Sequence, residues 1–191
     1  MELLPKVEVQ IQRSVCSALY KSALSQNQQP CAAFILGSSE DSSKPRFDFA
    51  LIAVASESWN ALDVVSLVSG LEKQLDNIHQ VAKDFQRDLI GIGVAWETFF
   101  VPNEHSRFGL LMDFACQNSI PFVLEVPVTG GESIWGLSVY QSNRFPQDSL
   151  EHKMVRQRST AALDNPRRVK GAWNQLLRET EAERGEVLLH P

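Results

Sequence analysis

Four side chains that can bind a metal ion or transfer a proton stand in one short segment: Glu97, Glu104, His105 and Asp113. Carboxylates and imidazole are the ligands that zinc, magnesium and manganese take in proteins. The segment follows the apolar run Leu89–Val94, and sites in α/β domains lie off the carboxyl ends of strands. One interpretation is therefore a metal-dependent hydrolase that uses this cluster. The other is a solvated acidic loop, because acidic residues beside one histidine are common on exposed loops.

No catalytic or cofactor-binding motif is complete elsewhere in the chain. Gly91-Ile92-Gly93 lacks the third glycine of a dinucleotide-binding loop and lies inside a predicted strand. Gly131-Glu132-Ser133 begins like a serine nucleophile elbow, but Trp135 stands where that motif needs glycine. Cys116 has only His105 nearby in sequence as a partner for a thiol nucleophile. We predict no catalytic residue, no cofactor and no metal site, and the balance favours a protein that is not an enzyme.

The hydrophobic periodicity predicts an α/β fold. Val7, Val9 and Ile11 alternate with polar residues, as in a half-buried strand, and the period then changes to that of a helix. Further along, the pattern predicts strands at 31–36, 47–55, 89–94, 121–128 and 134–140, and helices at 13–25, about 60–86, 108–117, 149–163 and 169–184. We expect one mixed β-sheet domain flanked by helices over residues 1–146, with a C-terminal helical tail over 147–191.

Composition is that of an ordinary globular chain. Of 191 residues, 43% are hydrophobic and 21% are charged. No apolar run approaches the ~20 residues of a membrane span, and the N-terminus has no signal-peptide pattern. Cys16, Cys31 and Cys116 lie among apolar neighbours, so we predict buried structural thiols in a reducing compartment. The expected location is the cytoplasm or the nucleus.

The order of the predicted elements resembles the MPN domain, also called the Mov34 or JAB/JAMM fold. Val7–Ile11 followed by a helix is similar to the opening of that family, and Ala33–Gly37 to its G-x-L-x-G strand. Leu89–Val94 resembles the strand that leads to the family's metal site. Pro121–Val128 and Trp135–Tyr140 resemble its closing pair of strands. The resemblance spans about residues 6–142 and is one of pattern, and it implies a mixed sheet flanked by helices.

The resemblance also implies that the chemistry of the family is lost. Active members bind zinc through an H-x-H pair and the aspartate of S-x-x-D, and a glutamate before the G-x-L-x-G strand acts as acid and base. This chain has Ala95-Trp96-Glu97-Thr98 after Val94, and Leu110 replaces the serine three residues before Asp113. Pro30 and Cys31 stand near the expected glutamate. Metal-free members act as scaffold subunits, so the resemblance implies a pseudoenzyme that binds other proteins, such as another MPN subunit or a second copy.

The predicted partner-binding residues lie in the C-terminal tail: Trp173, Leu176, Leu177, Arg167 and Arg168. The three apolar residues form a helical stripe, and the arginines belong to a basic run between residues 153 and 170. That run also raises the alternative of a nucleic-acid-associated subunit. Net charge is −5 overall, however, and an acidic body binds a phosphate backbone poorly, so protein partners are favoured. No membrane partner is expected.

Overall fold

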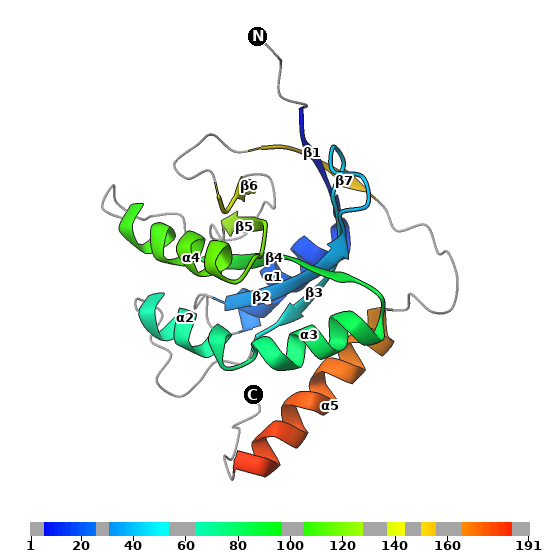
Figure 1. Ribbon diagram of the computed structural model, residues 1–191, viewed down its shortest axis with the longest axis vertical. Helices are drawn as coiled ribbons and strands as arrows, with labels where there is room; N and C mark the ends of the chain where they lie inside the picture. Colours follow the sequence, from blue (N-terminus) through cyan, green and yellow to red (C-terminus); the bar gives the residue numbers. More distant parts are fainter. Residues whose placement is uncertain are drawn as a thin grey trace.

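The structure, a computed structural model, describes residues 6–25, 31–53, 64–96, 105–127, 137–143, 150–155 and 166–184 (Figure 1). The strands are β1 (Glu8–Gln12), β2 (Cys31–Ser38), β3 (Arg46–Ile52), β4 (Asp88–Trp96), β5 (Phe122–Pro127), β6 (Ser138–Gln141) and β7 (Glu151–Val155). The helices are α1 (Arg13–Ser25), α2 (Val64–Glu72), α3 (Leu75–Asp84), α4 (His105–Gln117) and α5 (Pro166–Arg184). None of these helices is long and apolar enough to cross a membrane.

All of these strands form one mixed sheet in the order β6-β5-β4-β2-β3-β1-β7. Strands β1, β3, β4, β5 and β7 run in one direction, and β2 and β6 run against them. The α/β class, predicted from the periodicity, and the single mixed sheet, implied by the resemblance, are confirmed. The helix α5 corresponds to the second of the two helices predicted for the C-terminal tail.

The sheet has a helix-covered core on each face. One core gathers buried residues of α1 with residues of the sheet, and the other gathers residues of the sheet with α2, α3, α4 and α5. The sheet also curls around α1, which packs against β1 to β5. Its two edge strands meet at one corner, where the Leu150 N–H next to β7 donates to the Val139 carbonyl of β6 at 2.7 Å. The result is close to a barrel that holds α1 on its concave side.

Glycine within β4 has a packing explanation. A Cβ built on Gly93 would lie 2.7 Å from Leu19 Cδ1 of α1, and one on Gly91 would lie 3.3 Å from the Phe122 carbonyl oxygen. Glycine inside a strand weakens it unless another group must approach closely, and here a helix side chain does so. Gly93 therefore lets α1 lie directly on the sheet.

Two predicted helices differ from the structure. The long helix predicted for about 60–86 is two helices, α2 and α3, separated by a turn at Lys73 and Gln74. Within the helix predicted for 149–163, residues Glu151–Val155 form strand β7, which pairs in parallel with β1, and residues 156–163 lie outside the described ranges. Leu150 and Met154 have the four-residue spacing of a helix, but both pack on the α1 core, so tertiary pairing overrides the local pattern. The sheet thus continues beyond residue 146, where we placed the end of the α/β domain.

The strand predicted for 47–55 also differs in detail, because β3 contains a β-bulge. Phe47 and Phe49, predicted to share one face, lie in different cores: Phe47 packs on the α1 side and Phe49 on the opposite side. The pairing with β2 moves from Leu36↔Phe49 directly to Gly37↔Phe47, so Asp48 has no partner of its own. A bulge of this kind reverses the alternation of the strand and re-aims one side chain. Here the re-aimed residue is the aspartate.

Candidate functional site

The predicted metal cluster is not brought together by the residues that the structure describes. Glu97 and Glu104 lie outside the described ranges, and α4 begins at His105, three residues before the predicted start. His105 and Asp113 therefore stand eight residues apart on one helix, a rise of about 12 Å at 1.5 Å per residue. The helix backbone therefore does not place these two positions next to each other. Within the described ranges, no three His, Cys, Asp or Glu side chains are grouped as a metal site would need.

The sheet places side by side the two positions at which the MPN resemblance would put chemistry. Cys31, near the expected glutamate, is the cross-strand partner of Ala95, which follows the strand that leads to the family's metal site. Cys31 is 3% exposed and Ala95 is fully buried. The Cys31 thiol donates to the Leu19 carbonyl oxygen at 3.3 Å. This pair, which we call the seam, is apolar and carries no carboxylate or imidazole.

The three thiols are free and differ in exposure. Cys16 and Cys31 are buried, as predicted, but Cys116 is exposed on α4. Burial raises the pKa of the Cys16 thiol from 9.0 to about 12, since a thiolate loses its hydration in the core. Cys16 therefore stays protonated near neutral pH and is a poor nucleophile. The prediction that every thiol is buried is wrong for Cys116, because that residue lies on the outer side of its helix.

The opposite end of the central strands carries the charged interactions. Asp48, at the bulge of β3, is 6% exposed and is the one buried charged residue of the described ranges. Its Oδ2 lies 3.3 Å from Arg87 Nε and 3.4 Å from Arg46 Nη2. The Gln12 amide donates to its Oδ1 at 3.5 Å, and the Arg87 guanidinium lies 5.8 Å from the centre of the Phe49 ring. The carboxylate is compensated by two cations, as a buried charge must be.

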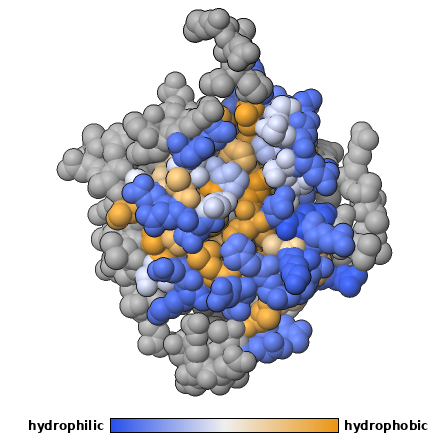
Figure 2. Space-filling view, in the orientation of Figure 1, coloured by the Kyte–Doolittle hydropathy of each residue, from blue (hydrophilic) through white to orange (hydrophobic). Residues whose placement is uncertain are grey.

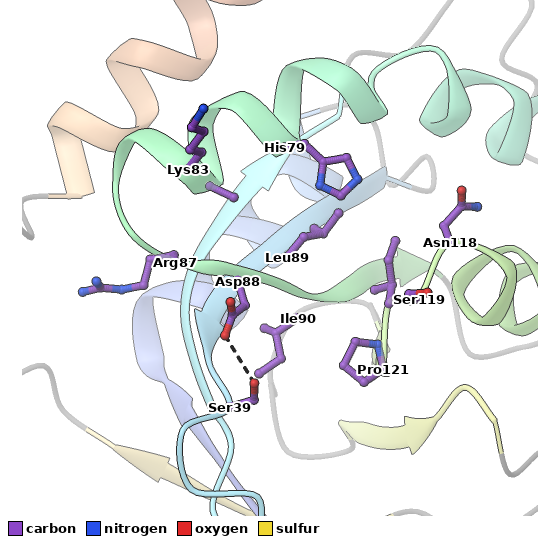
Figure 3. Close-up of a pocket in the computed structure, with 12 residues that line it drawn as sticks. Ser39, His79, Lys83, Arg87, Asp88, Leu89, Ile90, Asn118, Ser119 and Pro121 are labelled. Carbon is purple, nitrogen blue, oxygen red and sulfur yellow. Dashed lines mark hydrogen bonds between the residues drawn. The ribbon is translucent and has the colours of Figure 1, made fainter.

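Arg87 also borders an open groove at this end of the sheet (Figure 3). The groove lies where α3 and α4 end and where β4 and β5 begin, and its volume is about 510 Å³. Its lining residues are Ser39, His79, Ala82, Lys83, Arg87, Asp88, Leu89, Ile90, Asn118, Ser119, Ile120 and Pro121. Leu89 and Pro121 are the accessible apolar members, which we call the floor, whereas Ile90 and Ile120 are buried beneath the surface. The volume is in the range of small-molecule sites.

Two matching helix ends shape the groove. Gln86 follows α3 with φ 52°, and Ser119 follows α4 with φ 57°. In each case the next N–H donates five residues back, from Arg87 to the Ala82 carbonyl at 2.9 Å and from Ile120 to the Ala115 carbonyl at 2.8 Å. This is the Schellman helix end, whose left-handed residue is usually glycine. Both non-glycine residues with positive φ in the described ranges thus stand at this groove or next to it.

The predicted partner-binding residues of α5 divide into two groups. Trp173 is 1% exposed: its ring packs edge-on against Phe34, with centroids 5.8 Å apart, and its Nε1–H donates to the Ile52 carbonyl at 2.9 Å. It therefore anchors α5 to the sheet within the chain. Leu176 and Leu177 are partly buried against the same core, whereas Arg167 and Arg168 are exposed. Of these five residues, Arg167 and Arg168 therefore offer the most surface to a partner.

Sequence reasoning missed both the Asp48 network and the groove. Asp48 is a single charge within the otherwise apolar strand predicted for 47–55. Arg46 is two residues away, but Arg87, the cation that joins Asp48 to the end of α3, is 39 residues away. The groove joins Ser39, residues of α3 and the turn after α4, which no local pattern connects. Among the comparisons with known proteins, no family model matches this chain, and no curated protein matches it.

Proposed function

We propose that this chain is a non-catalytic, MPN-like protein-interaction subunit of a larger assembly. Between Glu8 and Gln141 the elements follow the order strand, helix, two strands, helical segment, strand, helix, two strands. That is the order on which the resemblance rests, with the helical segment divided into α2 and α3. The observed order supports the proposal at the level of the fold.

The observation that carries the proposal is the seam. In a catalytic member, the acid–base glutamate and the metal ligands would have to approach one another at this end of β2 and β4. The register pairs Cys31 with Ala95, and both are buried in the α1 core. Cys31 contributes a buried thiol that donates a hydrogen bond to a backbone carbonyl, and Ala95 contributes only a methyl group. Together they supply neither a set of zinc ligands nor a group that can carry a proton. These residue types favour a structural role for this position.

The interaction surface that we propose is the exposed side of α5 around Arg167 and Arg168, extended by the partly buried Leu176 and Leu177. This helix packs on α3 and β3 with Val169 and Trp173 inward, so its position relative to the body is set by the core (Figure 1). Arginine is enriched at protein interfaces because its planar group binds carboxylates in two places at once. The partner is a second subunit with an acidic patch.

The test is affinity capture from the native cell followed by reconstitution with purified components. The wild-type chain should capture a partner at fixed stoichiometry, and the charge reversal Arg167→Glu with Arg168→Glu should abolish the complex while leaving the fold intact. The matched control reverses Lys21 and Lys44, which are exposed elsewhere on the body. Equal loss in both variants would show only a general effect of charge.

Two results would contradict the proposal outright. One is a wild-type chain that remains monomeric at high concentration and assembles with no purified candidate. The other is hydrolytic turnover that chelators abolish, which would favour the metal-dependent hydrolase of the sequence analysis. Salt-sensitive binding of DNA or RNA that is lost on neutralising Arg167 and Arg168 would instead support the nucleic-acid alternative.

A further inference from the structure

Three basic residues line the groove, His79, Lys83 and Arg87, but this does not make its interior positively charged. In Figure 3 the His79 ring hangs from α3 over Leu89, while the Lys83 ammonium and the Arg87 guanidinium point away from the groove. The guanidinium is held by Asp48 and by the carbonyl groups of Phe85 and Gln86. The acidic group on the inner rim is the carboxylate of Asp88.

The Asp88 carboxylate is oriented and remains accessible. The Ser39 hydroxyl donates to Asp88 Oδ2 at 3.2 Å, which holds the side chain beside Ile90 (Figure 3). Asp88 itself is exposed, so its other oxygen can accept a hydrogen bond from a ligand. Two helices, α3 and α4, also end at this groove, and a helix carboxyl terminus has a partial negative charge. Both features favour a positive ligand over an anion such as phosphate.

The turn after α4 supplies an independent indication. Ser119 keeps a side chain at φ 57°, a backbone conformation in which glycine has no steric penalty. Strained residues that are kept in this way cluster at ligand-binding sites. Ser119 also lines the groove and stands across it from Asp88 (Figure 3). Its hydroxyl gives the site a second hydrogen-bonding group, beside the apolar floor of Leu89 and Pro121.

We propose that this groove binds a monocationic organic group, an ammonium or guanidinium on a short apolar stem. The cation pairs with Asp88, the stem lies on the apolar floor, and Ser119 accepts or donates a further hydrogen bond. Such a group can come from a free amine or from a lysine or arginine side chain of a bound protein. The second source rests on the proposed interaction function, whereas the first does not.

Nuclear magnetic resonance titration of the full chain tests the ligand chemistry. The probes are n-butylguanidinium and the peptide acetyl-Ala-Arg-Ala-amide, and the neutral control is the same peptide with citrulline in place of arginine. We expect amide shifts at residues 79–90 and 118–121 with both cations and none with citrulline. Binding of the peptide alone assigns the site to a protein partner, and binding of n-butylguanidinium alone assigns it to a small molecule. No site-specific shift with either cation would overturn the proposal.

Two aspartate variants distinguish a specific role of Asp88 from a general effect of the negative charge of the chain. Asp88→Asn should weaken the binding of either cation about tenfold, the usual loss when a charge-assisted hydrogen bond becomes a neutral one. Asp84→Asn makes the same charge change on α3, where Asp84 is exposed, accepts a bond from Gln80 at 2.8 Å and does not line the groove. It should change binding less than about twofold. Equal losses in the two variants would overturn the proposal.

A third variant separates binding from folding. Ser119→Gly relieves the left-handed backbone and should raise the unfolding temperature, yet it should weaken the binding of both cations. A more stable variant that binds as tightly as the wild type would remove Ser119 from the site and contradict the role assigned to it. This experiment uses no α5 partner, so its failure would leave the proposed assembly through α5 standing.

Discussion

The two ends of the central strands are stabilised in different ways. At the seam end, where Cys31 and Ala95 are paired, an aromatic contact attaches α5 to the sheet: the Trp173 ring packs edge-on against Phe34, and its N–H donates to the Ile52 carbonyl. We call the other end the bulge end; it contains Gly37, Asp48 and Asp88. There an ion pair attaches a helix to the sheet, because Arg87, after the end of α3, pairs with the buried Asp48. The seam end is apolar, whereas the bulge end carries charge, an open groove and strained turns.

The difference shows where a ligand could be accommodated in the described part of the fold. An apolar cross-strand pair maximises burial and leaves no polar group for a ligand. A bulge exposes backbone and re-aims side chains, which is why bulges recur beside functional sites. Carboxyl ends of parallel strands are the usual place for chemistry, yet here the groove lies where the parallel strands β4 and β5 begin.

The largest effect is expected from Gly37→Ala at the bulge end. A Cβ at Gly37 would overlap the carbonyl oxygen of Arg46, which is backbone and cannot move aside without breaking the β2–β3 pairing. We expect destabilisation by more than about 5 kcal/mol, or a chain that does not fold, measured by urea unfolding. Gly171→Ala is the control: no atom lies within 4 Å, so this change in α5 should stabilise by about 0.5–1 kcal/mol. Equal effects in the two variants would show that Gly37 is not tightly enclosed.

At the seam end, Trp173→Ala should cost about 4 kcal/mol, since it removes a large buried ring and leaves a cavity against Phe34. Trp173→Phe keeps most of the packing and loses the bond to the Ile52 carbonyl, so its cost should be about 1–2 kcal/mol. Both are measured by chemical unfolding. A Trp173→Ala chain that stays as stable as the wild type but loses its partner would instead place this residue at an interface.

The contribution of the Asp48–Arg87 ion pair to stability can be compared directly with that of the Trp173–Phe34 contact. Asp48→Ala should destabilise by about 3 kcal/mol, because it leaves the guanidinium of Arg87, whose side chain is 18% exposed, without its carboxylate. Adding Arg87→Leu should recover part of that loss, since the unpaired charge is then removed. Unfolding of the two single variants and the double variant measures this coupling. Strictly additive losses would mean that the pair is not a coupled unit.

The smallest effect is expected at the end of α3. Gln86→Gly removes the cost of a left-handed non-glycine residue, about 1–2 kcal/mol, and adds the entropy cost of glycine, about 0.5–1 kcal/mol. The net expectation is a gain of about 0.5 kcal/mol, seen as a rise in unfolding temperature. Gln86 does not line the groove, so cation binding should stay unchanged. A destabilised variant would show that the Gln86 side chain makes contacts that outweigh its strain.

Hydrophobic periodicity and local breaks in the sequence were enough to predict the α/β class and most of the elements, and the family resemblance implied that the strands form a single mixed sheet. The periodicity misjudged β7, because Glu151–Val155 has no strong pattern of its own and becomes a strand only through its pairing with β1. It placed Phe47 and Phe49 on one face, because a bulge is created by the register between strands and leaves no mark on a single strand.

Tertiary structure alone decided the candidate site. The Asp48–Arg87 pair joins residues 39 positions apart, and the groove assembles three segments around two helix ends. It also decided that Trp173, one of an apolar helical stripe, points into the core, because a stripe shows that a face is buried without showing what buries it. Contacts between distant segments depend on how the sheet curls and where its strands slip by one residue, and local sequence carries no record of either.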